Sequence, residues 1–188
     1  NHTLFKGLLF LAAGAVLYAT GTTDLDKLGG LSKRMPKTTI CFLVGAFSIS
    51  GLPPFNGFAS KWMIYQSTFA KAAETGNFAY AFVTIVALVV SVMTLASFIK
   101  VTQAVFFGQL PKHLEETKEV PMAMQIPMWI MSALCILGGI FYNWISANLL
   151  RPAAEAAFNV SKYVDTMMGA GYAETYRVVD MEIPTATF

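Results

Sequence analysis

The sequence predicts an all-α integral membrane protein with about four transmembrane helices, one of them broken at its middle, followed by a C-terminal amphipathic helix. Of its 188 residues, 55% are hydrophobic and only 13% are charged, against about 25% charged residues in a soluble domain. The mean hydropathy is +0.55. The net charge of +2 is too small to indicate a nucleic-acid partner, so the lipid bilayer is the expected environment.

Four apolar runs are candidate membrane spans, although the apolar part of the first is somewhat short for a helix that needs about 20 residues to span the hydrocarbon core. We place the spans at about residues 1–20, 38–70 (broken near 51–57), 78–107 and 127–149. Together they define a helical bundle over residues 1–149. Residues 150–188 are expected to form a peripheral amphipathic helix and a tail.

The first span carries two polar side chains, His2 and Lys6, which are four residues apart and therefore share one helix face. A lysine near the end of a span is ordinarily an interfacial anchor, and a lone histidine is ordinarily a satisfied polar residue. The alternative is a functional pair. These residues lead directly into an apolar run without the regions of a signal peptide, so we expect the sequence to start near or inside a helix of a longer protein.

The loop at residues 21–37 orients the protein. It holds four of the thirteen basic side chains, whereas the turn after the second span, at 71–77, holds one. Basic residues in short loops favour the cytoplasmic side. We therefore expect loops 21–37 and 108–120 to be cytoplasmic.

The second span contains Gly51, Pro53, Pro54 and Gly57 within a few residues of one another. Proline has no N–H to donate and its ring clashes with the preceding turn, while glycine lets the backbone leave helical geometry. A helix cannot run unbroken through this stretch. At membrane depth, a break is tolerated only where protein packs around it or water fills a cavity beside it.

Lys61 follows this break by one turn. An ionisable residue next to a discontinuous helix is typical of ion and substrate transporters, and intramembrane lysines are usually functional. Desolvation disfavours the charged form of a lysine, so a buried Lys61 could exchange a proton where a surface lysine cannot. The alternative is a tight turn with the ammonium snorkelling to an interface. Ser50 and Ser60 are the neighbouring candidates for lining an ion path.

The third span has Ser91, Thr94 and Ser97 at helical spacing, suited to face another helix or water. Lys100 follows near its end, where snorkelling is favoured over a role in an ion path. In the last span, Gly138-Gly139 indicates close helix packing. Beyond it, the apolar residues of 152–168 lie roughly on one side, as in a helix on a membrane surface or docked on a partner.

The sequence offers no enzyme chemistry of its own. Cys41 and Cys135 both lie in apolar runs, with no other metal-binding side chains near them in the sequence. His113 lies beside Glu115 and Glu116 in a loop of mixed charge that fits a solvated surface. No nucleophile is paired with a base. We therefore expect no metal site, no cofactor and no catalytic residue in this chain.

Three groups of motifs occur in order along the chain: His2-Thr3-Leu4-Phe5-Lys6-Gly7, Leu28-Gly29-Gly30-Leu31 with Met35-Pro36, and Gly51-Leu52-Pro53-Pro54-Phe55-Asn56-Gly57-Phe58-Ala59-Ser60-Lys61. These motifs closely resemble the antiporter-like subunits of respiratory complex I, Mrp-type sodium/proton antiporters and membrane-bound group 4 hydrogenases. The resemblance covers about residues 1–110. Beyond residue 121 the sequence shares only hydropathy with the family.

The resemblance implies a fold of about fourteen helices with two inverted repeats, each containing a broken helix. This chain is similar to the C-terminal portion, helix eleven onward. In the family, the residue matching Lys61 is the ionisable group of the second broken helix, and those matching His2 and Lys6 belong to a hydrophilic axis leading to it. The glutamate and lysine of the first broken helix are absent from this sequence, so an N-terminal antiporter half is an expected partner.

The resemblance thus implies the C-terminal part of a H⁺- or Na⁺-translocating subunit, in a redox-driven complex of an energy-transducing membrane. That complex is hydrogenase-like or NADH dehydrogenase-like, with its redox chemistry in other membrane subunits. One alternative is a stand-alone Mrp-type antiporter, which needs no redox partner. A second is a structural membrane subunit that does not conduct ions.

Overall fold

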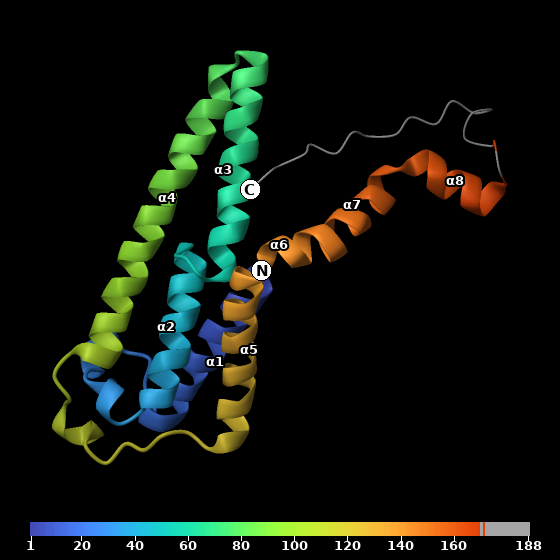
Figure 1. The fold of residues 1–188 in the computed structure, drawn as a ribbon. Coiled ribbons are helices and arrows are strands. Elements are labelled where there is room, and N and C mark those ends of the chain that lie inside the picture. Colours follow the sequence, from blue (N-terminus) through green and yellow to red (C-terminus); the bar gives the residue numbers. More distant parts are fainter. Residues whose placement is uncertain (170, 172–188) are drawn as a thin grey trace. The chain divides into compact units, whose positions relative to one another are not determined.

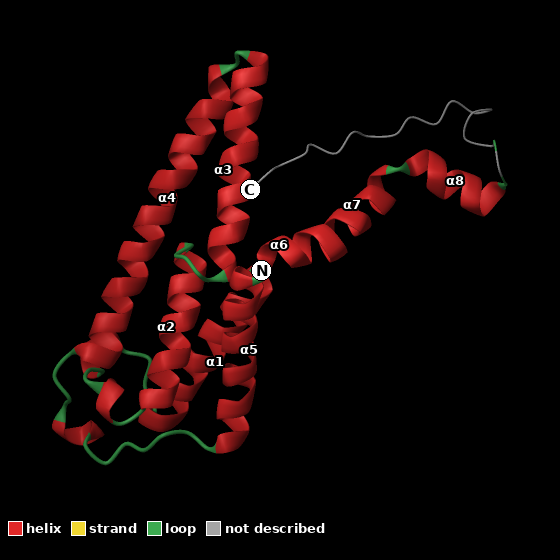
Figure 2. Ribbon diagram, in the orientation of Figure 1, coloured by secondary structure: helices red, strands yellow, loops and turns green. Residues whose placement is uncertain are grey.

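The computed structural model describes residues 1–169 and residue 171, and these form helices and connecting loops without strands. The chain divides into two compact units, one covering residues 1–140 and the other starting at Phe141. The helices of the first unit are α1 (His2–Thr20), α2 (Pro36–Ser50), α3 (Asn56–Thr75), α4 (Phe78–Thr102, followed by a π-helical turn over Gln103–Phe107) and α5 (Met122–Ile140) (Figures 1 and 2).

Three of these helices are long and apolar enough to cross a membrane, within the residues that the structure describes. They are α1, the combined Phe78–Phe107 helix and α5, and α2 is a shorter apolar helix. The predicted all-α membrane architecture is confirmed. The second predicted span is two separate helices, α2 and α3, joined by a short loop (Figure 1).

The fifth helix begins earlier and ends earlier than the sequence pattern indicates. We expected a span over 127–149, starting at a proline, but α5 starts at Met122 because the carbonyl of Pro121 accepts hydrogen bonds from the amides of Met124 and Gln125. Pro127 lies inside the helix. The helix ends at Ile140, directly after the glycine pair that packs on the break of the second span.

The second unit contains α6 (Tyr142–Ile145), a π-helical turn (Ser146–Leu150), α7 (Arg151–Phe158) and α8 (Val160–Met168). The amphipathic segment predicted over 152–168 is thus two short helices. Asn159 separates them, and its side chain accepts a hydrogen bond from the amide of Lys162 at 3.0 Å, which caps the start of α8. The predicted irregular tail falls on residues that lie outside the described part.

The core of the first unit is built on α1. Its buried residues recur every three or four positions, as expected for one apolar helix face, and they pack against α2 and α5. They are Phe5, Leu8, Leu9, Ala12, Ala15 and Val16. This packing fixes α2 and α5 side by side, with the end of α2 and the end of α5 both next to the loop that joins α2 to α3.

Loops 21–37 and 108–120, at the end of the bundle away from the helix break, pack against each other. A Cβ at Gly29 would lie 2.4 Å from the main-chain oxygen of Gln109, and one at Gly30, where φ is +60°, would lie 2.7 Å from the amide nitrogen of Leu110. Both positions therefore require glycine.

An ion pair lies in the first of these loops. The Lys27 ammonium is 3.1 Å from the Asp24 carboxylate and lowers the pKa of Asp24.

Glu119 joins the second loop to the start of α2. One carboxylate oxygen accepts a hydrogen bond from the amide of Lys37 at 2.9 Å, and the other accepts one from the hydroxyl of Thr38 at 2.6 Å. The first amides of a helix lack partners within the helix, and the helix dipole favours a negative charge there. Glu119 is therefore a capping residue supplied from a distant part of the chain.

Replacing Glu119 with alanine should destabilise the bundle. We expect Glu119→Ala to lower the free energy of unfolding by about 1–2 kcal/mol, because it removes a charged cap and leaves the hydroxyl of buried Thr38 without its acceptor. Thermal unfolding of the purified protein in detergent measures this effect. Glu116→Ala, an exposed change in the same loop, is the control. Equal melting of the two variants would contradict the capping role.

Candidate functional site

The end of α2 is a terminated helix, and it forms one side of the candidate site. Gly51 adopts the left-handed conformation, with φ +82° and ψ +41°. Its amide donates to the carbonyl of Ser48, and the amide of Leu52 donates to the carbonyl of Phe47. This pair of hydrogen bonds is a Schellman motif. It accounts for the carbonyls of Phe47 and Ser48 but provides no donor for that of Ser50, the last helical residue.

The start of α3 lies in backbone contact with the last turn of α2. A Cβ at Gly57 would lie 1.7 Å from the main-chain oxygen of Ser48. On the other side, a Cβ at Gly139 of α5 would lie 1.9 Å from the main-chain oxygen of Pro54. No side chain fits at either position. The break is therefore enclosed by the backbones of α2 and α5, which is the condition that a non-helical segment needs at membrane depth.

Lys61 supplies the donor that the end of α2 lacks. Its ammonium donates to the carbonyl of Ser50 at 3.1 Å. To reach it, the side chain passes over Gly51, where a Cβ would lie 2.7 Å from Cδ of Lys61. Lys61 is half-buried. A cation at the carbonyl end of a helix is stabilised by the helix dipole, so the ammonium and the two half-helices form one electrostatic unit.

Asn56, the first residue of α3, is a component of the site that the sequence analysis did not identify. It is completely buried. The side-chain nitrogen of Asn1 donates to the main-chain oxygen of Asn56 at 3.1 Å, and the side-chain nitrogen of Asn56 is 3.5 Å from the side-chain oxygen of Asn1. These contacts tie the start of α1 to the break. The only sequence signal was its place between Pro53-Pro54 and Gly57.

The structure does not bring His2 or Lys6 into contact with Lys61. Both side chains are exposed on α1. The His2 ring packs edge-on against Phe5, with ring centroids 5.3 Å apart, and the Lys6 ammonium lies 5.9 Å from the centroid of the Phe10 ring. Their predicted place on an axis leading to Lys61 therefore stays a prediction.

The three candidate lining residues occupy different environments. The Ser50 hydroxyl is buried and donates to the carbonyl of Ala46 at 2.7 Å. The Ser60 hydroxyl donates to the carbonyls at the start of its own helix. Lys100 is exposed near the end of α4. Of the three, only Ser50 belongs to the unit formed around the break, and it does so through its main-chain oxygen.

Polar pairs connect α3 to α4 beyond the break. The hydroxyls of Tyr65 and Ser91 are 2.5 Å apart, and those of Thr68 and Thr84 are 2.7 Å apart. Hydrogen bonds of this kind join helices within a membrane. The expectation that Ser91 faces a neighbouring helix is confirmed, whereas the Thr94 hydroxyl bonds to a carbonyl of its own helix.

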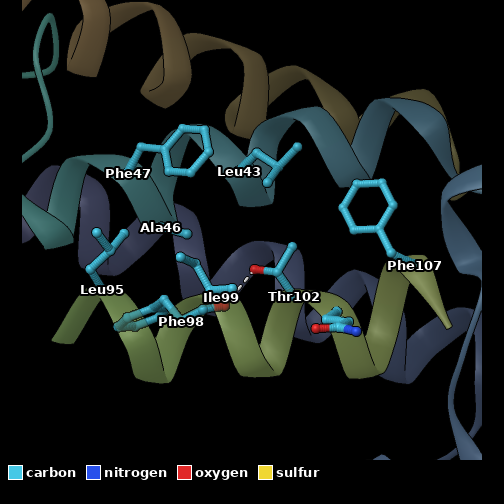
Figure 3. Close-up of a pocket in the computed structure, with 9 residues that line it drawn as sticks. Leu43, Ala46, Phe47, Leu95, Phe98, Ile99, Thr102 and Phe107 are labelled. Atoms are coloured by element: carbon cyan, nitrogen blue, oxygen red, sulfur yellow. Dashed lines mark hydrogen bonds between the residues drawn. The ribbon is translucent and has the colours of Figure 1, made fainter. Parts of the chain in front are cut away.

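An apolar groove with a volume of about 370 Å³ lies between α2 and α4 (Figure 3). Leu43, Ala46 and Phe47 line one side, and Leu95, Phe98, Ile99, Thr102, Gln103 and Phe107 line the other. The Thr102 hydroxyl donates a hydrogen bond to the carbonyl of Phe98 at 2.6 Å. Apart from Thr102 and Gln103, the side chains that line the groove are apolar. Among the described residues, no group of three or more histidine, cysteine or acidic side chains is arranged to hold a metal.

Comparison with known proteins identifies the family. Residues 1–94, half of the chain, match the family model described as NADH:quinone oxidoreductase/Mrp antiporter, transmembrane. The chain belongs to this family. The resemblance predicted from the motifs around the break is thereby confirmed, as is the membrane location.

Members of the NADH:quinone oxidoreductase/Mrp antiporter family with curated names align beyond the region of the motifs. The expectation that only hydropathy is shared with the family beyond residue 121 is therefore wrong. Hydrogenase-4 component B of Escherichia coli is 37% identical over 158 residues, 81% of this chain and 23% of that protein. Formate hydrogenlyase subunit 3 of E. coli is 34% identical over 177 residues, 89% of this chain and 29% of that protein. Na⁺/H⁺ antiporter subunit A1 of Staphylococcus aureus is 37% identical over 162 residues, 83% of this chain and 20% of that protein. The chain thus spans about a quarter of the length of these relatives.

Two solved structures share the fold. A chain of the membrane-bound sulfane sulfur reductase, an archaeal respiratory membrane complex, superposes with a TM-score of 0.63 at 34% identity, over 73% of this chain and 22% of that one. A chain of the Mrp complex from Dietzia sp. DQ12-45-1b superposes with a TM-score of 0.64 at 25% identity, over 77% of this chain and 34% of that one. The helix order of the family is therefore present in this chain.

Proposed function

We propose that this chain is the C-terminal part of a subunit that moves H⁺ or Na⁺ across an energy-transducing membrane. The observation that carries the proposal is the contact between the Lys61 ammonium and the Ser50 carbonyl at the helix break, 3.1 Å long. A cation within a membrane is energetically costly, and such residues usually mark the path of an ion or a substrate. The family relationship supports this interpretation, because its named members include an Na⁺/H⁺ antiporter subunit.

In this proposal Lys61 has two distinguishable states. With its proton, the ammonium pairs with the Ser50 carbonyl and lies at the negative end of α2. Without it, the neutral amine carries no charge for the dipole to hold and its hydrogen bond to the carbonyl weakens. Arrival or departure of an ion next to Lys61 would shift the balance between these states. His2 and Lys6, the polar residues on the same face of α1, would act on this balance through water.

The proposed function also requires partner subunits in the membrane. Relatives of this chain are components of hydrogenase-4, formate hydrogenlyase and the Mrp antiporter. We place the chain within a multisubunit membrane complex, next to a segment that supplies the first broken helix of the antiporter fold. Redox chemistry and its cofactors would belong to other subunits. Loops 21–37 and 108–120 would face the cytoplasm.

A stand-alone Mrp-type antiporter is the second candidate. The similarity to the Mrp complex, with a TM-score of 0.64, favours it as directly as the hydrogenase relatives favour a redox-driven complex. Subunits that co-purify with the chain separate the two, because only a redox-driven complex contains iron–sulfur or flavin proteins. A structural subunit that does not conduct ions would use the same contact only as a helix cap, and ion translocation by Lys61→Ala separates it from the proposal.

Ion translocation by the intact complex in sealed vesicles tests the proposal. The vesicles are energised either with the redox substrates of the co-purified subunits or with an imposed ion gradient, and internal pH and sodium are followed with fluorescent probes. We expect an ion gradient that a proton or sodium ionophore abolishes, and the effective ionophore identifies the ion. Activity of the complex without any ion movement would contradict the proposal.

A further inference from the structure

Three buried side-chain oxygens in the described part of the chain have no hydrogen-bond partner, and one of them belongs to the break. They are Oδ1 of Asn56, Oε1 of Gln125 and Oγ of Ser132. All three residues are buried, and Asn56 is completely so. Asn56 lies at the break, whereas Gln125 and Ser132 lie on α5, away from the loop between α2 and α3. A buried amide without its hydrogen bonds is unfavourable, and an apolar side chain of the same shape would avoid that cost.

The orientation of the Asn56 amide follows from its neighbour. The side-chain nitrogen of Asn1 is committed to the main-chain oxygen of Asn56, so the side-chain oxygen of Asn1 faces Asn56 as an acceptor. Only the nitrogen of the Asn56 amide can meet an acceptor. Its oxygen Oδ1, with two lone pairs, therefore points away from Asn1 without a donor.

The surroundings of Asn56 keep protein donors away from this oxygen. Gly138 and Gly139 of α5 lie against Asn56 with hydrogen atoms instead of side chains: an added Cβ would lie 3.4 Å from Cβ of Asn56 at Gly138 and 2.7 Å from its main-chain nitrogen at Gly139. The Lys61 ammonium is committed to the Ser50 carbonyl on the α2 side of the break. The Asn56 oxygen is thus an available acceptor enclosed by α1, α3 and α5, one turn from the ionisable group of the site.

We infer that Oδ1 of Asn56 is a binding position for the mobile species at the helix break, an electropositive small ligand that is either a proton-carrying water or a monovalent cation. Both present to an amide oxygen the positive end that it lacks in the protein. This inference rests on the proposed function, since it assigns a ligand to the same break. It adds a second contact at the break, next to Asn1 and the glycine pair of α5.

The test compares three variants of the intact complex in sealed vesicles. Asn56→Leu keeps the shape of the side chain and removes the acceptor, so translocation should fall roughly tenfold or more. Asn56→Asp keeps the acceptor and adds a charge. Ser132→Ala, which removes a buried oxygen without a partner elsewhere in the bundle, should stay within about twofold of the wild type. The amount of assembled complex is measured in every sample.

The aspartate variant identifies the ligand and keeps the inference testable if the leucine variant fails to assemble. Sodium is titrated at constant pH, and pH is varied at constant sodium. A changed half-saturating sodium concentration assigns a cation, and translocation that is slowed but stays independent of sodium assigns a proton-carrying water. Wild-type behaviour of Asn56→Asp in both titrations, or wild-type translocation by Asn56→Leu, would overturn the inference. If Lys61→Ala still abolishes translocation in that case, the proposed function stands and only the role of Asn56 is lost.

Discussion

Gly57→Ala should prevent the assembly of a stable protein. The new Cβ would lie 1.7 Å from the main-chain oxygen of Ser48, far inside contact distance, and the obstacle is backbone rather than the end of a flexible side chain. α3 would have to move away from α2, which would also pull the loop off α5. We expect a loss of stability on the order of 3 kcal/mol, measured as folded protein recovered from membranes and as the melting temperature in detergent.

Gly14→Ala is the matched control for this substitution. Gly14 also lies within a helix of the bundle, but a Cβ there would meet nothing within 4 Å. Alanine favours the helix over glycine, so this variant should be recovered at wild-type levels or higher. Recovery of Gly57→Ala at the level of Gly14→Ala would show that α3 does not cross α2 as the structure has it.

Lys61→Ala should abolish ion translocation while leaving the complex assembled. The substitution removes the ammonium and leaves the Ser50 carbonyl without its donor, so both states of the proposed switch disappear. We expect translocation to fall roughly a hundredfold or to background, since a charge-assisted hydrogen bond of about 1.5–3 kcal/mol is lost together with the titrating group. The measurement is ion uptake into sealed vesicles, with redox or exchange activity recorded in parallel.

Lys71→Ala provides the control within the same helix. Lys71 is exposed on α3 and pairs with Glu74 at 3.1 Å. Such a surface pair contributes little, so translocation should remain at the wild-type rate. Unchanged translocation in Lys61→Ala would return Lys61 to the role of an interfacial anchor and would favour the structural subunit.

The helix break could be predicted from the sequence because its cause is local. Two adjacent prolines between two glycines exclude an α-helix whatever surrounds them. The apolar runs likewise defined α1 and the Phe78–Phe107 helix closely. Lys61 could be selected as a candidate for a similar reason, since a lysine in an apolar region is recognisable without knowledge of its neighbours.

The partners at the site could not be predicted, because they are backbone atoms or residues distant in sequence. The Lys61 ammonium bonds to a main-chain oxygen eleven positions earlier, and no side-chain pattern encodes a carbonyl. Asn56 bonds to Asn1, and Glu119 bonds to the start of α2 across 82 positions. The start of α5 was placed too late because Pro127 resembles a helix start, whereas the preceding Pro121 carbonyl begins the helix.

The central claim is that the Lys61 ammonium acts through its contact with the end of α2. Ion translocation by Gly51→Ala tests it most directly, because this variant keeps the lysine and displaces it: the new Cβ would lie 2.7 Å from Cδ of Lys61. Gly76→Ala is the control, since Gly76 has a similar left-handed backbone, φ +65°, with nothing within 4 Å of the added Cβ. We predict that translocation by Gly51→Ala falls roughly tenfold while Gly76→Ala retains the wild-type rate. Wild-type translocation by Gly51→Ala would contradict the claim, since Lys61 would then work without the contact that defines the site.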